Sequence, residues 1–243
     1  MSPKGASVSL DHVEFGYAET RVHFDVHIDA GSFVAVTGPS GSGKTTMLNL
    51  VAGFETPERG AVKIDGVDVT STFASQRPVS FLFQENNLFS HLSVSDNVAL
   101  GISPSLRLTG DQNRRVLESL DRVEMSDKAA RLPAQLSGGE RQRAALARVL
   151  VQENPILLMD EPFASLGPNL RLEMSILVKE LQAEHAMTVL LVTHHPSEIA
   201  DIAPLLCFVE AGRVAAFGPT AQLLSAQGPP SLRQYLGADS QIR

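Results

Sequence analysis

The feature that most constrains this chain is a glycine-rich loop set between an apolar strand and a helix. Phe33-Val34-Ala35-Val36-Thr37 is apolar on both faces, a pattern typical of a buried strand. Gly38-Pro39-Ser40-Gly41-Ser42-Gly43-Lys44-Thr45 follows directly, and the next residues, 45–52, have helical character. This order predicts an α/β fold with a mostly parallel sheet and a ligand site at the carboxyl ends of its strands.

The loop has the spacing of a P-loop, which predicts a site for the phosphates of ATP. Its glycines let the backbone wrap closely, so several N–H groups can converge on an anion at the start of the helix. Lys44 would neutralise the β- and γ-phosphate oxygens, and the Thr45 hydroxyl could bind Mg²⁺. We place Thr46 among the nucleotide contacts as well. The alternative, a Gly/Ser-rich turn with an incidental lysine, does not explain the strand and helix on either side.

A second apolar strand, Ile156-Leu157-Leu158-Met159, ends in the carboxylates Asp160 and Glu161. A buried strand would hold both groups rigidly. Asp160 is expected to reach the Mg²⁺ shell, and Glu161 to orient or deprotonate the attacking water. An apolar strand that ends in Asp-Glu is common, so this prediction depends on the phosphate loop upstream.

Composition and charge narrow the class of protein. A chain of 243 residues that is 43% hydrophobic can bury a core in one large domain or two small ones. The net charge of −7 argues against nucleic acid as a partner, because phosphate neutralisation needs a clustered Lys/Arg excess. The single cysteine, Cys207, lies in an apolar run and is expected in the core. No stretch reaches the roughly 18 apolar residues of a membrane span, so docking is the expected route to a membrane.

Hydrophobic periodicity divides the chain into three parts. The first is β-structure, since Val22, Phe24, Val26 and Ile28 alternate with polar residues, and a turn is expected at Asp65-Gly66. Residues 93–150 then change to a helical period. Here Asp111 is a candidate cap, and one helix face would carry the following apolar residues: Val116, Leu117, Leu120 and Val123.

Strands and helices alternate again in the third part. Strands are expected at 156–159 and 188–193, with a helix between them and a short helix around Glu198. A hairpin is expected near 210–213, and the pattern fades after Leu224. The helical middle part thus interrupts an α/β chain.

One further run distinguishes among the families that share the phosphate loop. Leu136-Ser137-Gly138-Gly139-Glu140 begins a helix upstream of the Asp160 strand, and Arg141-Gln142-Arg143-Ala144-Ala145-Leu146-Ala147-Arg148 continues it. Ser137 can cap this helix while Gly138 and Gly139 expose N–H groups, so its start favours an anion. An ordinary capped helix is the alternative. The run closely resembles the signature motif of ATP-binding cassette (ABC) ATPases, which also precedes that strand.

The resemblance implies the fold and the chemistry. It predicts an α/β P-loop NTPase with a RecA-like core, an N-terminal antiparallel β-subdomain and an inserted helical subdomain, all within one ABC ATPase domain, 1–243. The core with its β-subdomain would span about 1–88 and 151–224, the helical subdomain 89–150, and a C-terminal tail 225–243. In this family two copies sandwich two ATP molecules, and the signature of one copy faces the γ-phosphate held by the other.

Three more residues match motifs of the family. Tyr17 resembles the aromatic residue that stacks on adenine, although a tyrosine near a strand end can equally be a core or rim residue. Gln84, after Val79-Ser80-Phe81-Leu82-Phe83, resembles the glutamine that senses Mg²⁺ and water and links the site to the membrane subunits. His194 resembles the histidine that contacts the γ-phosphate, and we prefer it to its neighbour His195.

Two positions depart from the family pattern. Glu140 stands where glutamine is usual, and a carboxylate beside a γ-phosphate is unfavourable unless it turns to solvent or a cation. We therefore expect Glu140→Gln to leave turnover intact or raise it. Gly167 stands where an aspartate usually helps to join the two ATP sites, which puts the coupling between the sites in doubt.

The segment 77–92 resembles that of bacterial thiamine importer ATPases, while iron(III), polyamine and sulfate importers share much of it. The resemblance implies ATP hydrolysis that energises the uptake of thiamine or its phosphate esters, with the other three solute classes as alternatives. The resemblance implies a peripheral subunit on the cytoplasmic face of the bacterial inner membrane. Its partners would be a second copy, a membrane permease and, through the permease, a periplasmic solute-binding protein.

Residues 85–98, with Phe89 exposed, are expected to contact the permease. Alternatively, Leu88, Phe89 and Leu92 cover the core of the helical part.

Two other classes of protein remain open from the sequence. A soluble ABC protein acting in translation or DNA repair would usually carry two cassettes, coiled-coil inserts or basic surfaces, and the sequence pattern indicates none of these. A P-loop kinase for small molecules would leave the helix at Ser137 unexplained.

Overall fold

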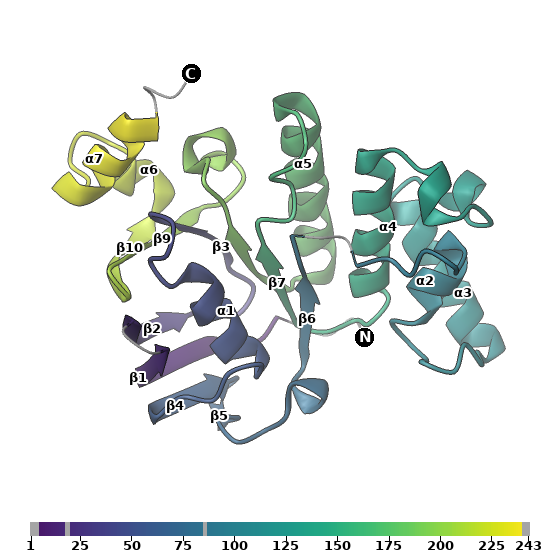
Figure 1. The fold of residues 1–243 in the computed structure, drawn as a ribbon, viewed down its shortest axis with the longest axis horizontal. Coiled ribbons are helices and arrows are strands. Elements are labelled where there is room, and N and C mark those ends of the chain that lie inside the picture. Colours follow the sequence, from purple (N-terminus) through teal and green to yellow (C-terminus); the bar gives the residue numbers. More distant parts are fainter. Residues whose placement is uncertain (1–4, 18–19, 85–86, 240–243) are drawn as a thin grey trace.

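The protein forms one twisted sheet flanked by helices (Figure 1). The structure, a computed structural model, describes residues 5–17, 20–84 and 87–239. Within them the strands run in the order β5-β4-β1-β2-β10-β9-β3-β8-β7-β6. The strands are β1 (Val8–Tyr17), β2 (Thr20–Ile28), β3 (Phe33–Thr37), β4 (Arg59–Ile64), β5 (Val67–Asp68), β6 (Val79–Leu82), β7 (Ile156–Asp160), β8 (Thr188–Val192), β9 (Leu205–Glu210) and β10 (Arg213–Pro219).

Five neighbouring strands, β9, β3, β8, β7 and β6, are parallel and form the centre of the fold. Every residue of β3 and β8 is buried, because both faces of these strands are covered. Phe33 and Ala35 point into one core and Val34 and Val36 into the other. The buried parallel strand predicted before the phosphate loop is confirmed, with the predicted bounds.

The other half of the sheet is mainly antiparallel, with one parallel pairing between β10 and β2 at Arg213 and His23. Strand β1 pairs with β2 and β4, and β4 turns into β5 through Asp65 and Gly66, which both have positive φ. Strands β9 and β10 form the predicted hairpin. In β2 the buried residues alternate with more exposed ones, so the strand keeps one wet face as expected.

The helices fall into groups on the sheet. They are α1 (Lys44–Ala52), α2 (Val94–Ala99), α3 (Gly110–Arg122), α4 (Gly138–Leu150), α5 (Pro168–His185), α6 (Thr220–Leu223) and α7 (Pro230–Asp239). Helix α1 packs in one core with strands of the antiparallel half, whereas α4 and α5 pack on the opposite face. Figure 1 shows α2, α3 and α4 together at the β6 end of the molecule. None of the helices in the described residues combines the length and apolar composition that a membrane span needs.

Helix α3 begins differently from the sequence prediction. Thr109, not Asp111, is the cap: its hydroxyl accepts the N–H of Gln112, whose side chain accepts the N–H of Thr109 in return. Asp111 lies in the first turn and pairs with Arg114. The prediction that Leu117 shares the apolar face is wrong, because this residue is 58% exposed.

A further helix, α7, lies beyond Leu224, where the sequence pattern predicts no regular element. Helix α7 buries Leu232 completely, and the ring of Tyr235 lies 5.9 Å from that of Phe208 on β9. A helix with only a few apolar residues gives a weak periodic signal, and its partners lie far away in the sequence. At least residues 230–239 of the expected tail are therefore packed helix; the other subdomain boundaries stay predictions.

Candidate functional site

The phosphate loop joins β3 to α1 in a conformation that only glycine adopts easily. Gly38 has φ 148°, and a Cβ there would come within 1.9 Å of the Val209 carbonyl oxygen. Gly43 has φ 104° immediately before the first helical residue, Lys44. The Ser42 N–H donates to Pro39 O at 3.1 Å. The backbone thus bends tightly at the N-terminus of α1, as anion binding requires.

Lys44 fills the inside of this loop. Its Nζ donates to the carbonyl oxygens of Gly38 at 2.8 Å and Pro39 at 2.9 Å, and the residue is only 5% exposed. Burial lowers the pKa of Lys44, while the carboxylates of Glu161 and Asp160 raise it in opposition. The ammonium therefore lies between the loop and the acidic end of β7, where a phosphate chain would meet it.

Thr45 and Asp160 meet across the gap between α1 and β7. Thr45 Oγ1 donates to Asp160 Oδ2 at 2.9 Å. Burial raises the pKa of Asp160, with the hydrogen bond from Thr45 opposing it and Glu161 adding to it. The other oxygen, Oδ1, is buried and has no hydrogen-bond partner among the described residues. An orphaned carboxylate oxygen beside a hydroxyl suits Mg²⁺, which takes oxygen ligands from few residues and shares phosphates and water.

Glu161 and His194 form the third contact of the site. His194 Nε2 lies 2.7 Å from Glu161 Oε1, and His194 Nδ1 lies 3.4 Å from the Tyr235 hydroxyl. Glu161 has φ 47°, an uncommon conformation for a residue other than glycine and one that recurs at functional sites. His195 is exposed instead. His194 therefore contacts Glu161, and its role at the γ-phosphate stays a prediction.

Two predicted residues lie at the margin of this cluster. Gln84 is exposed two residues beyond the end of β6, whose Leu82 pairs with Met159 of β7, so it lies at the same edge of the sheet as Glu161. Tyr17 ends β1, and its side chain falls outside what the structure describes.

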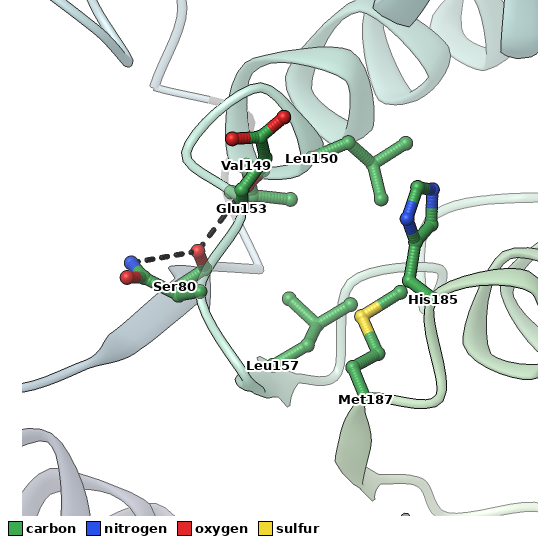
Figure 2. Close-up of a pocket in the computed structure, with 8 residues that line it drawn as sticks. Ser80, Val149, Leu150, Glu153, Leu157, His185 and Met187 are labelled. Atoms are coloured by element: carbon green, nitrogen blue, oxygen red, sulfur yellow. Dashed lines mark hydrogen bonds between the residues drawn. The ribbon is translucent and has the colours of Figure 1, made fainter. Parts of the chain in front are cut away.

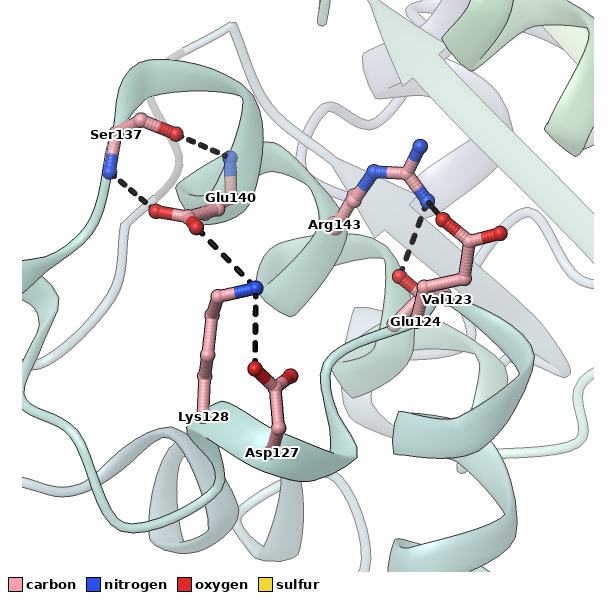
Figure 3. A network of polar contacts seen from close by, with 7 residues as sticks. All are labelled: Val123, Glu124, Asp127, Lys128, Ser137, Glu140 and Arg143. Carbon is pink, nitrogen blue, oxygen red and sulfur yellow. Dashed lines mark hydrogen bonds and ion pairs between the residues drawn. The ribbon is translucent and has the colours of Figure 1, made fainter.

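The helix at Ser137 starts apart from the phosphate loop. In Figure 1 β6 stands between α1 and α4. Ser137 caps α4 by accepting the Glu140 N–H at 3.3 Å, and Glu140 Oε2 accepts the Ser137 N–H at 2.7 Å (Figure 3). A Cβ on Gly139 would lie 2.7 Å from the Leu170 side chain, whereas one on Gly138 would have its nearest neighbour, Leu166, at 3.9 Å. The chain therefore presents two separate helix starts suited to anions.

Several residues near these helix starts escaped the sequence prediction. Gln142 is 1% exposed, and its Nε2 donates to the Pro162 carbonyl oxygen, which joins α4 to the turn after Glu161. The sequence could have indicated Gln142, because it belongs to the run of residues that follows Ser137 and resembles the family motif. Tyr235 and Lys128 gave no comparable signal, because their contacts depend on distant segments.

Gly167 occupies the N-cap of α5 with φ −64° and provides no side-chain cap. A Cβ there would meet no atom within 4 Å. The backbone at this position therefore leaves room for a Cβ, and glycine supplies no carboxylate there.

A pocket elsewhere in the molecule does not belong to this site. Figure 2 shows its mixed lining, in which Val149, Leu150, Leu157 and Met187 are apolar and Ser80, Glu153 and His185 are polar. Leu157 comes from the first half of β7, and Met187 directly precedes β8. These residues lie at the amino ends of the parallel strands, opposite to the edge that carries Asp160 and Glu161.

Comparison with known proteins decides the family. The family model described as ABC transporter matches residues 22–164, which is more than half of the chain. The chain belongs to the ABC transporter family. The predicted family, the α/β fold and the ATP-hydrolysing activity are thereby confirmed, and the open alternative of a small-molecule kinase falls away.

Similar proteins and structures extend over nearly the whole chain. Thiamine import ATP-binding proteins from Brucella suis and Vibrio vulnificus are 54% and 47% identical, over 96% and 95% of this chain and 96% and 99% of their own. Among solved structures, a dimer of the ATP-binding cassette MJ0796 bound to ADP and Pi is 30% identical, covers 88% of this chain and 98% of its own, and has a TM-score of 0.74. The ADP conformation of MJ1267, 21% identical with a TM-score of 0.85 over 96% and 98%, shares the fold.

Proposed function

We propose that this ABC ATPase drives the import of thiamine through a membrane permease on the cytoplasmic face of a bacterial inner membrane. The observation that carries the chemical part is the convergence of Lys44, the Thr45–Asp160 pair and the Glu161–His194 pair at one edge of the sheet. The thiamine part rests on relatives about half identical in sequence that carry that name. A periplasmic thiamine-binding protein would deliver the substrate to the permease.

Each residue has a task in hydrolysis that follows from its position. The backbone N–H groups of the loop between Ser40 and Thr46 bind the phosphates, and Lys44 exchanges its contacts with the Gly38 and Pro39 carbonyls for phosphate oxygens. Thr45 and Asp160, assisted by Gln84, would hold Mg²⁺, which supplies charge neutralisation at the β- and γ-phosphates.

The carboxylate of Glu161 orients the attacking water and accepts its proton. His194 holds that carboxylate through Nε2 and faces the same end of the sheet. Tyr17 is proposed to stack on the adenine ring.

The second helix start implies a second copy of the chain. Because α4 begins away from the phosphate loop, the Ser137 hydroxyl and the backbone N–H groups of Gly138 and Gly139 would receive the γ-phosphate of an ATP bound to another protomer. The similarity to a dimeric cassette supports this arrangement. Closure of two protomers around ATP would then transmit force to the permease.

Permease contact is proposed for the surface around Phe89. The Phe89 N–H donates to Asn97 Oδ1 at 2.7 Å, and Asn97 Nδ2 donates to Phe89 O and Leu92 O at 3.1 Å each. Asn97 is fully buried, so it fixes this loop on α2 while the Phe89 side chain stays 49% exposed. Leu88 packs on the core instead. This division of roles favours a docking function for Phe89 over the alternative that it covers the core.

A second aromatic cluster directly precedes Gln84 in the chain and is proposed as a further contact. The rings of Phe81 and Phe83 are 4.4 Å apart, and Phe54 lies 5.4 Å from Phe81. Phe54 and Phe83 are 49% and 38% exposed. Exposed aromatic groups of this kind are typical of protein interfaces.

Reconstitution tests the proposal. The chain, its permease and its binding protein would be placed in proteoliposomes, and ATP hydrolysis measured with thiamine, spermidine, sulfate or iron(III) present. Stimulation by thiamine alone supports the proposal, whereas stimulation by one of the others reassigns the substrate. Phe89→Ala should keep the soluble ATPase rate and lose stimulation by the permease. Phe73→Ala, at another site that is 75% exposed, is the control and should keep both.

A further inference from the structure

Glu140 places a negative charge at a helix start that is proposed to receive a phosphate. It is the third residue of α4, within the first turn after the Ser137 cap. A carboxylate aimed at the incoming γ-phosphate would repel it, and the repulsion would be strong in a closed interface of low dielectric. The position of the Glu140 carboxylate therefore decides whether the start of α4 can bind a phosphate.

Both oxygens of the Glu140 carboxylate have partners within the same protomer. Oε2 accepts the Ser137 N–H at 2.7 Å, and Oε1 lies 3.3 Å from Lys128 Nζ, as Figure 3 shows. These contacts, with the backbone hydrogen bond from Ser137 largest, lower the pKa of Glu140, so the group stays ionised at neutral pH. The side chains of Lys128 and Glu140 are only 21% and 26% exposed.

The backbone fixes Lys128 opposite Glu140. Lys128 ends a short 3₁₀ helix, Ser126–Lys128, which follows the fully buried Met125. The next residues are tied to the start of α2, because Ser95 N–H donates to Ala129 O at 2.9 Å and Val94 N–H donates to Arg131 O at 2.8 Å. Lys128 also lies 3.5 Å from Asp127, a longer and more exposed contact. The ammonium is thus held where it meets Glu140.

We propose that Lys128 is a positioning residue for ATP-driven closure, which holds the Glu140 carboxylate against the Ser137 backbone and offsets its charge at the start of α4. This inference rests on the proposed ATP sandwich between two copies. In this chain the Lys128–Glu140 pair as a whole takes the place of the neutral glutamine that is usual in the family. The Ser137 N–H stays bonded to Glu140, and the Ser137 hydroxyl and the Gly138 N–H then face the phosphate without a net negative charge beside them.

A double-mutant cycle in the full chain tests this role. Lys128→Met keeps the length of the side chain and removes its charge, and it should raise the KM for ATP by roughly tenfold, the effect of one uncompensated charge near a bound anion. Glu140→Gln alone should leave ATP turnover unchanged or raised. The double variant Lys128→Met/Glu140→Gln should recover the wild-type KM, because no negative charge then remains to be offset.

Controls separate this role from a structural one. Lys128→Arg should keep the wild-type KM, and the defect of Lys128→Met should shrink as salt is added. Lys63→Met is the matched control, because Lys63 pairs with Asp11 at 2.8 Å on the antiparallel half of the sheet. This variant should leave the KM for ATP unchanged. A Lys128→Met defect that Glu140→Gln does not rescue, or no defect at all, overturns the proposal. If Lys128→Met does not fold, a double variant with the wild-type KM would still support it, and a double variant with a raised KM would overturn it.

One further variant distinguishes this inference from the proposed function. Ser137→Arg places a bulky cation at the start of α4 and should abolish hydrolysis if the two copies close there. Full activity of Ser137→Arg would refute the sandwich itself. If Ser137→Arg loses activity while Lys128→Met keeps the wild-type KM for ATP, only the role of Lys128 is refuted.

Discussion

His194 Nε2 lies 2.7 Å from Glu161 Oε1, although the two residues are 33 positions apart in the chain. They meet because β7 and β8 are parallel neighbours, with Asp160 paired to Val192, so the residues that follow these two strands emerge together. The positive φ of Glu161 accompanies this placement at the end of the strand.

Glu161→Gln should lower the rate of ATP hydrolysis by about 100-fold or more while ATP binding persists. The amide keeps the shape and the contact with His194 but cannot accept the proton of the attacking water. Phosphate release and equilibrium ATP binding would measure the two effects separately. Glu180→Gln, an exposed change on α5, is the control. A residual rate above a tenth of the wild type would remove Glu161 from the proposed role.

Asp160→Asn should raise the stability of the protein at pH 7 to 8 when no nucleotide or Mg²⁺ is added. Burial raises the pKa of Asp160 in the folded state above its ordinary value of 3.8, so the folded form binds this proton more tightly than the unfolded form. The free energy of unfolding of the wild type therefore falls as pH rises from the ordinary value through the raised one.

The Asp160→Asn variant does not lose unfolding free energy in this way. The difference in unfolding free energy between the variant and the wild type should therefore shrink as the pH falls toward 4. Urea unfolding at a series of pH values measures it. Adding Mg²⁺ and ATP should stabilise the wild type more than the variant, because asparagine lacks the charge that holds the cation. A constant difference between wild type and variant across the pH range would contradict this account.

The thiol of Cys207 should resist modification in the folded protein. The residue is completely buried on β9, and burial raises the pKa of its thiol to about 12, which suppresses the reactive thiolate. Ellman's reagent should detect no thiol in the native protein and one per chain in denaturant, since Cys207 is the sole cysteine. Rapid labelling without denaturant would show that β9 is less enclosed than described.

Leu232→Ala should destabilise the protein by about 2–5 kcal/mol, the usual effect of truncating a buried leucine. Leu232 is fully buried, and α7 packs through it on the main core. Gln234→Ala, on the exposed face of the same helix, should change the free energy of unfolding by less than ~0.5 kcal/mol. Chemical denaturation measures both variants, and equal values would mean that α7 does not depend on the core.

Local patterns were sufficient for much of the fold. The strand at 33–37, the turn at Asp65 and Gly66 and the hairpin after β9 were all predictable, because each depends on burial or turn chemistry within a few residues. The cap of α3 was not, since Thr109 and Asp111 are both competent caps and only the backbone conformation selects one. Helix α7 escaped for a different reason: its packing on Phe208 is a tertiary contact.

The sequence by itself determined the elements of the site, because the phosphate loop, the acidic end of β7 and the capped start of α4 are each set by residues adjacent in the chain. Only the tertiary structure decided which of their side chains meet. The Thr45–Asp160 contact depends on how α1 packs beside β7, and the approach of Lys128 to Glu140 depends on the 3₁₀ turn between α3 and α4. Such contacts join segments that no local pattern relates, and their geometry is set by the packing of the whole core.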